Sequence, residues 1–188
     1  HKEYRRQRQM CIRDRLMLAE KLSGGYAPTV TYVDDVFSSW LRTGTGADVT
    51  TTTNIDMTKG YMIWTKGRSG ATDHAIYDSA RGVTYELASN ITAAQTTQST
   101  GLKSISSTGY TIGSLAKMNT SSATYVDWTF RKAAKFFDVV TYTGNGTTQN
   151  VSHSLGGTVG CVIVKDTTSA GAWHTWHLGL TSGNRIEL

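Results

Sequence analysis

The order of apolar and polar residues changes in character after Val33. From there on, short runs rich in β-branched and aromatic residues alternate with clusters of Gly, Asn, Asp and Ser, with almost no helical apolar period. This pattern predicts an all-β domain, an antiparallel β-sandwich of short strands. We expect the strands at residues 35–43, 49–53, 61–66, 74–79, 83–89, 102–106, 110–113 and 124–131.

The segment 124–131 shows the alternation of a strand most clearly. Successive side chains of a strand point to opposite sides of a sheet, so one set faces the core. The two sets are Val126, Trp128 and Phe130 on one side and Tyr125, Asp127 and Thr129 on the other. Trp40 and Trp64, like Trp128, alternate with other apolar residues and are expected in the core.

A tight hairpin is expected between residues 74 and 90. Two strand-like runs flank Ala80-Arg81-Gly82 in this segment. Because glycine has no side chain, Gly82 is free to take the positive φ that such a turn needs.

An internal repeat emerges at an offset of 100 residues. Nine of the 38 positions from 37 to 74 are identical at this offset, among them Phe37 with Phe137, Gly60 with Gly160 and His74 with His174. Each copy is expected to open with a strand, a glycine turn and a second strand. The chain then divides into a linker at 16–32, which holds a short N-terminal helix, a β-sandwich repeat at 33–133, and the truncated start of a second repeat at 134–188.

The formal net charge of +5 is concentrated near the N-terminus. From Leu16 onward, 13 basic residues face 12 acidic ones. The string RRQRQMCIRD at 5–14 resembles the translation of a transposon-end adapter used in sequencing libraries, and residues 1–15 are therefore expected to be a sequencing artefact. Without this tract the charge no longer indicates a nucleic-acid partner.

A family resemblance covers most of residues 33–188. The segments that carry it include YVDDVFSSWLRTGTG, GYMIWTKGRSGATDHAIYDSARG and WTFRKAAKFFDVVTYTGNG. They resemble a repeated, largely uncharacterised domain of tail-fibre-like and other virion proteins of bacteriophages, especially marine ones. That family resembles the concanavalin or laminin-G type of jelly roll. The resemblance implies a place in the phage particle, contacts with other virion proteins and the homotrimer common among fibres, and it brings no catalytic residues.

The sequence offers little for catalysis. A sandwich glycosidase needs two carboxylates about 5–10 Å apart, typically from alternating positions of one strand, and no expected strand provides them. The chain has no phosphate loop and no dinucleotide fingerprint, so no cofactor is expected. His174 and His177 would point to opposite sides of a strand, so no metal site is expected either. We therefore expect a protein that is not an enzyme.

Binding of a host-surface glycan or receptor is the chemistry that the residues favour most. Sugars bind to aromatic platforms flanked by polar groups on loops. A carbohydrate-active enzyme module of the same fold and a ligand-free spacer remain as alternatives. With no signal peptide and no membrane-spanning run, a soluble protein without a membrane partner is expected. The candidate ligand-binding residues are Asp73, His74, Arg81, Trp173, His174, Trp176 and His177.

Overall fold

The computed structural model describes residues 31–181 and 184–187. The chain divides into two units, His1–Thr31 and Tyr32–Leu188, and the second holds nearly all of the described residues. The adapter-like tract at 1–15, most of the linker at 16–32 and the short helix expected in it lie outside the described residues. Within the described part of the chain, no helix is both long and apolar enough to cross a membrane.

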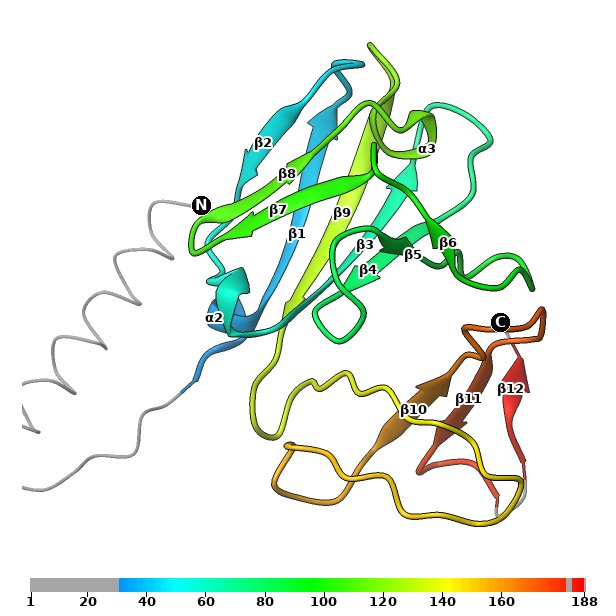
Figure 1. Cartoon of the computed structure of the whole chain (residues 1–188). Coiled ribbons are helices and arrows are strands. Elements are labelled where there is room, and N and C mark those ends of the chain that lie inside the picture. Colours follow the sequence, from blue (N-terminus) through cyan, green and yellow to red (C-terminus); the bar gives the residue numbers. More distant parts are fainter. Residues whose placement is uncertain (1–30, 182–183, 188) are drawn as a thin grey trace, which may run out of the picture. The chain divides into compact units, whose positions relative to one another are not determined.

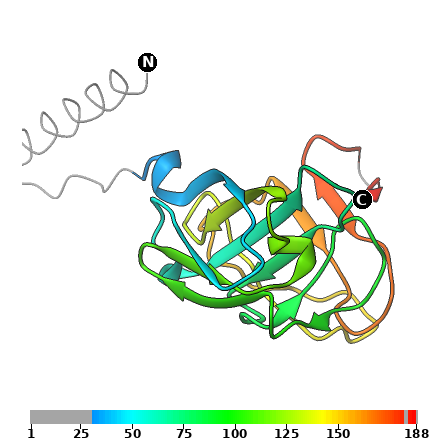
Figure 2. The ribbon, with the colours of Figure 1, turned by 90° about the horizontal axis from the view of Figure 1, so that it is seen from above.

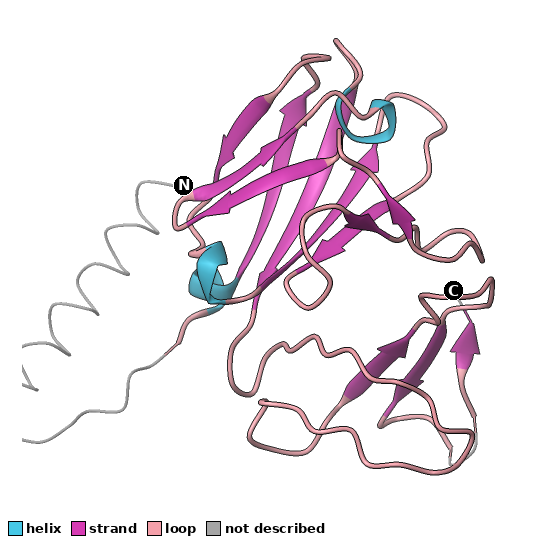
Figure 3. Ribbon diagram, in the orientation of Figure 1, coloured by secondary structure: helices cyan, strands magenta, loops and turns pink. Residues whose placement is uncertain are grey.

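The described unit consists mostly of antiparallel strands, with only short helical turns between them (Figure 3). The expectation of an all-β protein is confirmed at this level. The first part contains α2 (Val33–Val36), β1 (Phe37–Thr43), β2 (Val49–Thr52), η1 (Met57–Lys59), β3 (Tyr61–Gly67), β4 (Ala75–Asp78), β5 (Tyr85–Glu86), β6 (Thr96–Thr97), β7 (Leu102–Ser106), β8 (Gly109–Ile112), α3 (Ala116–Asn119) and β9 (Thr124–Arg131). The last part contains β10 (Cys161–Val164), β11 (His174–His177) and β12 (Ile186–Glu187).

The strands form four sheets, in the orders β1-β9-β3-β4, β2-β8-β7, β5-β6 and β10-β11-β12. The β2-β8-β7 sheet lies across the four-stranded sheet (Figures 1 and 2). Strand β1 pairs with β9, from Phe37 opposite Phe130 to Thr43 opposite Thr124. The first and last strands of this part are therefore neighbours, and the four-stranded sheet is complete only when the chain returns at β9.

One apolar core joins these two sheets. Ile63 of β3 and Tyr77 of β4 are fully buried, and they belong to the same cluster as Leu102 of β7 and Tyr110 and Ile112 of β8. We call the side of the four-stranded sheet that carries Ile63 and Tyr77 the inner face, and the opposite side the outer face.

The polar set of β9 faces this core. Asp127 and Thr129 are fully buried on the inner face. Trp128 and its neighbour Trp64 lie half-buried on the outer face, and Trp40 on strand β1 is 42% exposed. The expectation that the three tryptophans lie in the core is wrong for Trp40. The alternation of apolar residues does not show this, because Trp40 lies opposite Asp127, on the same face of the sheet, but on the edge strand β1.

The predicted hairpin after β4 is present. Gly82 has a φ of +101° and its N–H donates to the carbonyl of Asp78 at 2.9 Å. Beyond the turn, Ile76 and Leu87 exchange both backbone hydrogen bonds, at 2.8 and 3.1 Å. The strand expected at 83–89 is shorter than predicted, and β6, which pairs with it, has no counterpart among the expected strands.

The expected opening strand of the second repeat is wrong. Among the described residues, 134–160 contain no strand, and only an isolated bridge joins Ala133 to Phe137. At the corresponding position of the expected first repeat, β1 is extended because β9 pairs along its whole length. No described strand lies beside 137–143 to supply those hydrogen bonds. The glycine turn does form, with Gly146 at a φ of +75°.

Asp138 organises this strand-free segment. Lys132 Nζ lies 2.8 Å from Asp138 Oδ1, and Ser154 donates to Oδ2 from its backbone N–H at 2.7 Å and from its hydroxyl at 2.8 Å. The carboxylate therefore ties residue 132, at the end of β9, to residue 154. Burial of the carboxyl raises its pKa, but the hydrogen bonds from Lys132 and Ser154 outweigh burial and bring the pKa of Asp138 down to about 2.

Acidification should loosen this segment. Because the folded pKa of Asp138 is lowered from the ordinary 3.8, its contribution to stability is complete above pH 3.8 and is lost as the pH falls toward 2. A carboxyl-carbon NMR titration should give a midpoint near pH 2 for Asp138. In the wild-type protein, the amide of Ser154 should lose its protection from hydrogen exchange over this pH interval. Asp138→Asn has no carboxyl group to titrate, so it should not show this loss. A midpoint at pH 3.8 or above for Asp138 in the wild-type protein would show that Lys132 and Ser154 do not stabilise its carboxylate.

Candidate functional site

The seven predicted ligand-binding residues occupy two regions. Asp73 and His74 lie in the loop before β4, and Arg81 lies in the turn after it. His174, Trp176 and His177 belong to β11, and Trp173 directly precedes that strand. The seven residues thus form two groups in the structure. Within each group, some side chains are taken up by internal contacts and others are more exposed.

Arg81 is occupied by internal contacts. Its side chain is 7% exposed and its Nη2 lies 2.6 Å from Asp78 Oδ2. Further donors of the guanidinium reach the carbonyls of Tyr85 and Ile76, at 3.2 and 3.3 Å. This arrangement holds the hairpin turn, and little of the guanidinium faces solvent.

Trp173 is buried against the first part of the chain. Its indole is 7% exposed, contacts Ile76 and Leu87, and donates from Nε1 to the carbonyl of Ala88 at 3.0 Å. Half-buried Met62 and Trp64 of the outer face pack against the same cluster. Trp173 therefore anchors the C-terminal part of the chain to the outer face.

Asp73 and His74 form one polar cluster with Asn90. Asn90 Nδ2 donates to Asp73 Oδ1 at 2.8 Å, and the backbone N–H of His74 donates to Asn90 Oδ1 at 2.9 Å. Trp64 Nε1 donates to His74 Nδ1 at 2.6 Å, and the two rings lie 5.7 Å apart. Since Nδ1 accepts this bond, the remaining proton of a neutral imidazole is on Nε2, which makes Nε2 a donor. The cluster thus offers a carboxylate, an amide and an imidazole donor beside an aromatic ring.

The histidines of β11 do not converge. Cys161 is paired with His177 and Val164 with His174, so the two imidazoles lie on opposite faces of the small sheet. His177 Nδ1 accepts from the backbone N–H of Gly179 at 3.0 Å, and His174 Nδ1 lies 3.6 Å from Glu187 Oε1. Across the described residues, no group of three His, Cys, Asp or Glu side chains is arranged to hold a metal ion.

A hollow lies beside His177, with a volume of about 570 Å³. Lys135, Phe136, Leu155, Cys161 and His177 are among the residues that line it. The sequence did not indicate this hollow, because its walls come from the strand-free segment and from β10 and β11.

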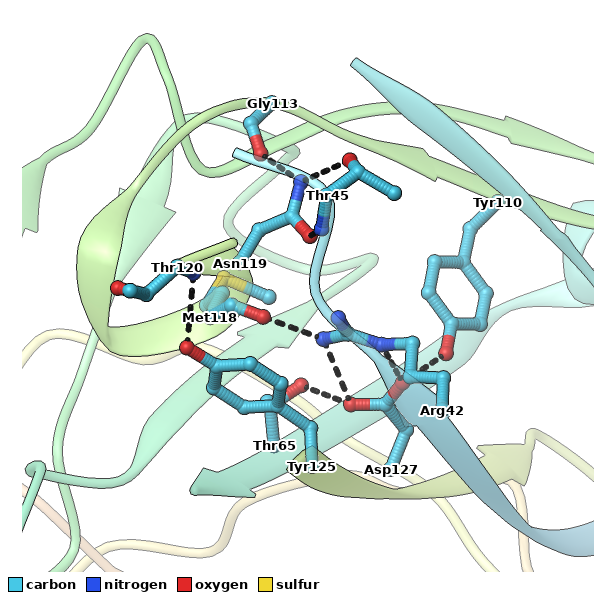
Figure 4. A network of polar contacts seen from close by, with 10 residues as sticks. All are labelled: Arg42, Thr45, Thr65, Tyr110, Gly113, Met118, Asn119, Thr120, Tyr125 and Asp127. Carbon is cyan, nitrogen blue, oxygen red and sulfur yellow. Dashed lines mark hydrogen bonds and ion pairs between the residues drawn. The ribbon is translucent and has the colours of Figure 1, made fainter. Parts of the chain in front are cut away.

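Two buried acids, Asp127 and Glu86, are held by hydrogen bonds and cations inside the protein. Asp127 accepts from Arg42 Nε at 2.5 Å, from Thr65 Oγ1 at 2.6 Å and from the hydroxyl of Tyr110 at 2.6 Å (Figure 4). Burial, and next the charge of Asp127, raise the pKa of Tyr110 well above its ordinary value, so its hydroxyl remains a donor. Asp127 is fully buried, and this network holds the core together out of reach of a ligand.

Glu86, on β5, has a similar set of partners. It is 2% exposed, accepts from the hydroxyl of Tyr77 at 3.0 Å and lies 2.7 Å from Lys117 Nζ. Each carboxylate is therefore paired with a cation and accepts a hydrogen bond from a neutral tyrosine. Neither is free to act as the acid or base of a glycosidase.

A family model described as a domain of unknown function (DUF7483) matches residues 33–188. The chain belongs to this family. The DUF7483 match starts at α2 and extends over all four sheets of the described structure. No curated protein and no solved structure matched the chain.

Two members of the polar cluster of this DUF7483 domain were missed by sequence reasoning. Asn90 was not among the predicted ligand-binding residues, and Trp64 was expected in the core. Asn90 lies 16 positions after His74, on the far side of the hairpin, and the contact follows from the pairing of β4 with the segment after it. A search for polar residues at the two ends of the predicted hairpin would have found it.

Lowering the pH should break the bond between Trp64 and His74 in the DUF7483 domain. Burial, and next the charge of Lys66, lower the pKa of His74 below its ordinary 6.5, with Asp73 opposing them. Because the folded chain binds this proton less readily than the unfolded chain, the full contribution of His74 is present above pH 6.5. It is lost as the pH falls below that value toward the lowered pKa.

The indole N–H signal of Trp64 in ¹H–¹⁵N NMR spectra measures this change. We expect the signal to move with a midpoint below pH 6.5. Trp64→Phe removes the donor that favours the neutral imidazole, so it should raise the midpoint of His74. A His74 midpoint at or above 6.5 in the wild-type domain would refute the interpretation.

Proposed function

We propose that this chain is a non-enzymatic β-sandwich module of the concanavalin or laminin-G type, with an architectural role in a phage virion appendage such as a tail fibre. The observation that carries the architectural role is a row of small hydroxyl side chains on one face of the β2-β8-β7 sheet. Thr50 lies opposite Thr111, which lies opposite Ser104, and Thr50 Oγ1 is 2.9 Å from Thr111 Oγ1. Thr52 and Ser106 extend this exposed face on either side of Gly109.

The distribution of charged and aromatic groups supports the same role. Arg81, Trp173, Asp127 and Glu86, which have the chemistry of binding or catalytic residues, are used for internal contacts. A spacer module needs this internal stability and a surface without a reactive site. The resemblance to phage appendage domains supplies the proposed setting, with other virion proteins as partners and a homotrimer as the proposed assembly.

Sequencing the genomic region that surrounds the gene tests the virion setting. We expect neighbouring genes for phage structural proteins. Genes of cellular metabolism on both sides would overturn it. Reads from a library prepared without transposon adapters should at the same time lack the RRQRQMCIRD tract.

A second candidate function is glycan binding by the Asp73–His74–Asn90 cluster. It is favoured by one observation, that a carboxylate, an amide and a neutral imidazole are held together beside the Trp64 ring. Such groups can form hydrogen bonds to the polar rim of a sugar, while an aromatic ring contacts its apolar face.

A glycan array probed with the full chain tests this candidate. If a glycan binds, Asp73→Ala and Asn90→Ala should each weaken binding at least tenfold. Thr50→Ala, on the hydroxyl face, is the matched control and should leave binding unchanged. Absence of any bound glycan would reject glycan binding and leave the spacer role. Glycan cleavage during the assay would instead favour the carbohydrate-active enzyme.

A further inference from the structure

The β10-β11 hairpin has the geometry of the β3-β4 hairpin. Both are antiparallel, and their innermost pairs are Thr65 with Ala75 and Val164 with His174. The segments that connect these two innermost pairs, 66–74 and 165–173, have the same length. Lys66 and Lys165 open these segments, and each donates from Nζ to the carbonyl of the next residue, at 3.1 and 2.7 Å.

Residues at the same place in the two hairpins, such as Thr65 and Val164, are 99 positions apart in the sequence. This offset is one less than the 100 positions that separate the identical residues of the expected sequence repeat. It places Val162 and Val164 at the positions of Ile63 and Thr65, and His174 and Trp176 at those of Ala75 and Tyr77. The face of β10-β11 that carries Val162 and Trp176 therefore corresponds to the inner face of the four-stranded sheet.

The two corresponding faces differ in their exposure. Ile63 and Tyr77 are fully buried, whereas Val162 is 39% exposed and Trp176 is 40% exposed. In the first copy, the face is covered by Leu102 of β7 and by Tyr110 and Ile112 of β8. Among the described residues, β10-β11-β12 has no sheet of this kind packed against it.

We propose that the face of β10-β11 with Val162, Val164 and Trp176 is a docking surface for an antiparallel β-hairpin of the β7-β8 kind. That hairpin presents apolar side chains at alternating positions and is supplied by polypeptide joined after residue 188. In the first copy the covering strands follow β4 in the same chain, which is why a covalently linked hairpin is the occupant. The proposal does not depend on glycan binding or on a virion setting.

Extending the full chain tests the proposal directly. Residues 89–131 of the same sequence, which contain β7, β8 and β9, are appended after residue 188. We expect amide hydrogen exchange in β10 and β11 to slow at least tenfold. We also expect the ¹⁹F NMR signal of fluorotryptophan at Trp176, assigned with Trp176→Phe, to shift to that of a buried ring. Unchanged exchange in β10 and β11, with the first part still protected, would overturn the proposal.

The matched control carries the same extension with aspartate at the appended counterparts of Tyr110 and Ile112. Charges at these positions cannot enter an apolar core, so this extension should leave exchange in β10 and β11 as it is in the unextended chain. Equal protection by both extensions would show that apolar docking is not the cause, and would reject the proposal.

Measurements on the unextended chain decide the matter if the extended one does not fold. The control variant is Leu41→Asp, since Leu41 is 62% exposed. A dye that fluoresces when it binds apolar surfaces should give at most half as much fluorescence with Val162→Asp as with this control. If Val162→Asp leaves the fluorescence of the dye unchanged, the proposal is overturned. Sedimentation should show that the wild-type chain does not associate through this face. A dimer that Val162→Asp dissociates would assign the face to a second copy and reject the hairpin.

Discussion

Replacing Asp127 with alanine should destabilise the folded unit by about 3–5 kcal/mol, the range found when one partner of a buried ion pair is removed. Asp127 is fully buried and the side chain of Arg42 is 8% exposed, so the guanidinium would stay in the core without its counter-charge. The hydroxyls of Thr65 and Tyr110 would lose their acceptor at the same time. Urea unfolding followed by circular dichroism measures the loss.

The control for Asp127→Ala is Asp48→Ala. Asp48 also pairs with a cation, Lys103 at 2.9 Å, but both side chains are exposed, so its loss should cost less than about 1 kcal/mol. The double variant Arg42→Met/Asp127→Leu removes both charges and should be more stable than Asp127→Ala. A cost below about 1 kcal/mol for Asp127→Ala would mean that the ion pair does not organise the core.

Local signals predicted several of the strands, but not β6 or β10 to β12. The strands expected at 124–131 and 102–106 have the same bounds as β9 and β7, and along 124–131 the period of a strand is visible within the strand itself. Gly82 predicted its turn for a similar reason, since the positive φ is a property of one position.

The side of β9 that enters the core could not be predicted in this way. Asp127 is a residue type that usually faces solvent. It is buried because Arg42, 85 positions earlier, reaches it from the neighbouring strand. Such a pair depends on which strands become neighbours, and the alternation within β9 is the same whichever face is buried.

Only part of the candidate site could be predicted, again because contacts between distant residues depend on the fold. Asp73 and His74 are adjacent in sequence and remain together, but Asn90 joins them only through the fold. Arg81 was a candidate because of its position near the turn, and its partner Asp78 is three residues away on the same turn. Residue type suggested binding chemistry, whereas the internal partners show which donors are already occupied.

Replacing Trp173 with alanine should cost about 3–5 kcal/mol, as is typical of a buried tryptophan. The indole fills the cluster with Ile76 and Leu87 and donates to the carbonyl of Ala88, so its loss leaves both a cavity and an unpaired acceptor. Hydrogen exchange should speed up most at Gly171, whose N–H donates to the carbonyl of Thr92 at 2.8 Å beside the anchor. Chemical denaturation gives the total loss.

Trp176→Ala is the matched control for Trp173→Ala, because Trp176 lies three positions further on and is 40% exposed. It should change stability by less than about 1 kcal/mol, since little apolar contact is lost from a half-exposed ring. The pair also separates the ligand-binding role predicted from the sequence for Trp173 from the anchor role that the structure indicates. A residue that binds ligand would lose affinity without losing stability, whereas the anchor role requires that Trp173→Ala detach residues 165–173 from the outer face. A stability equal to that of Trp176→Ala would therefore refute the anchor.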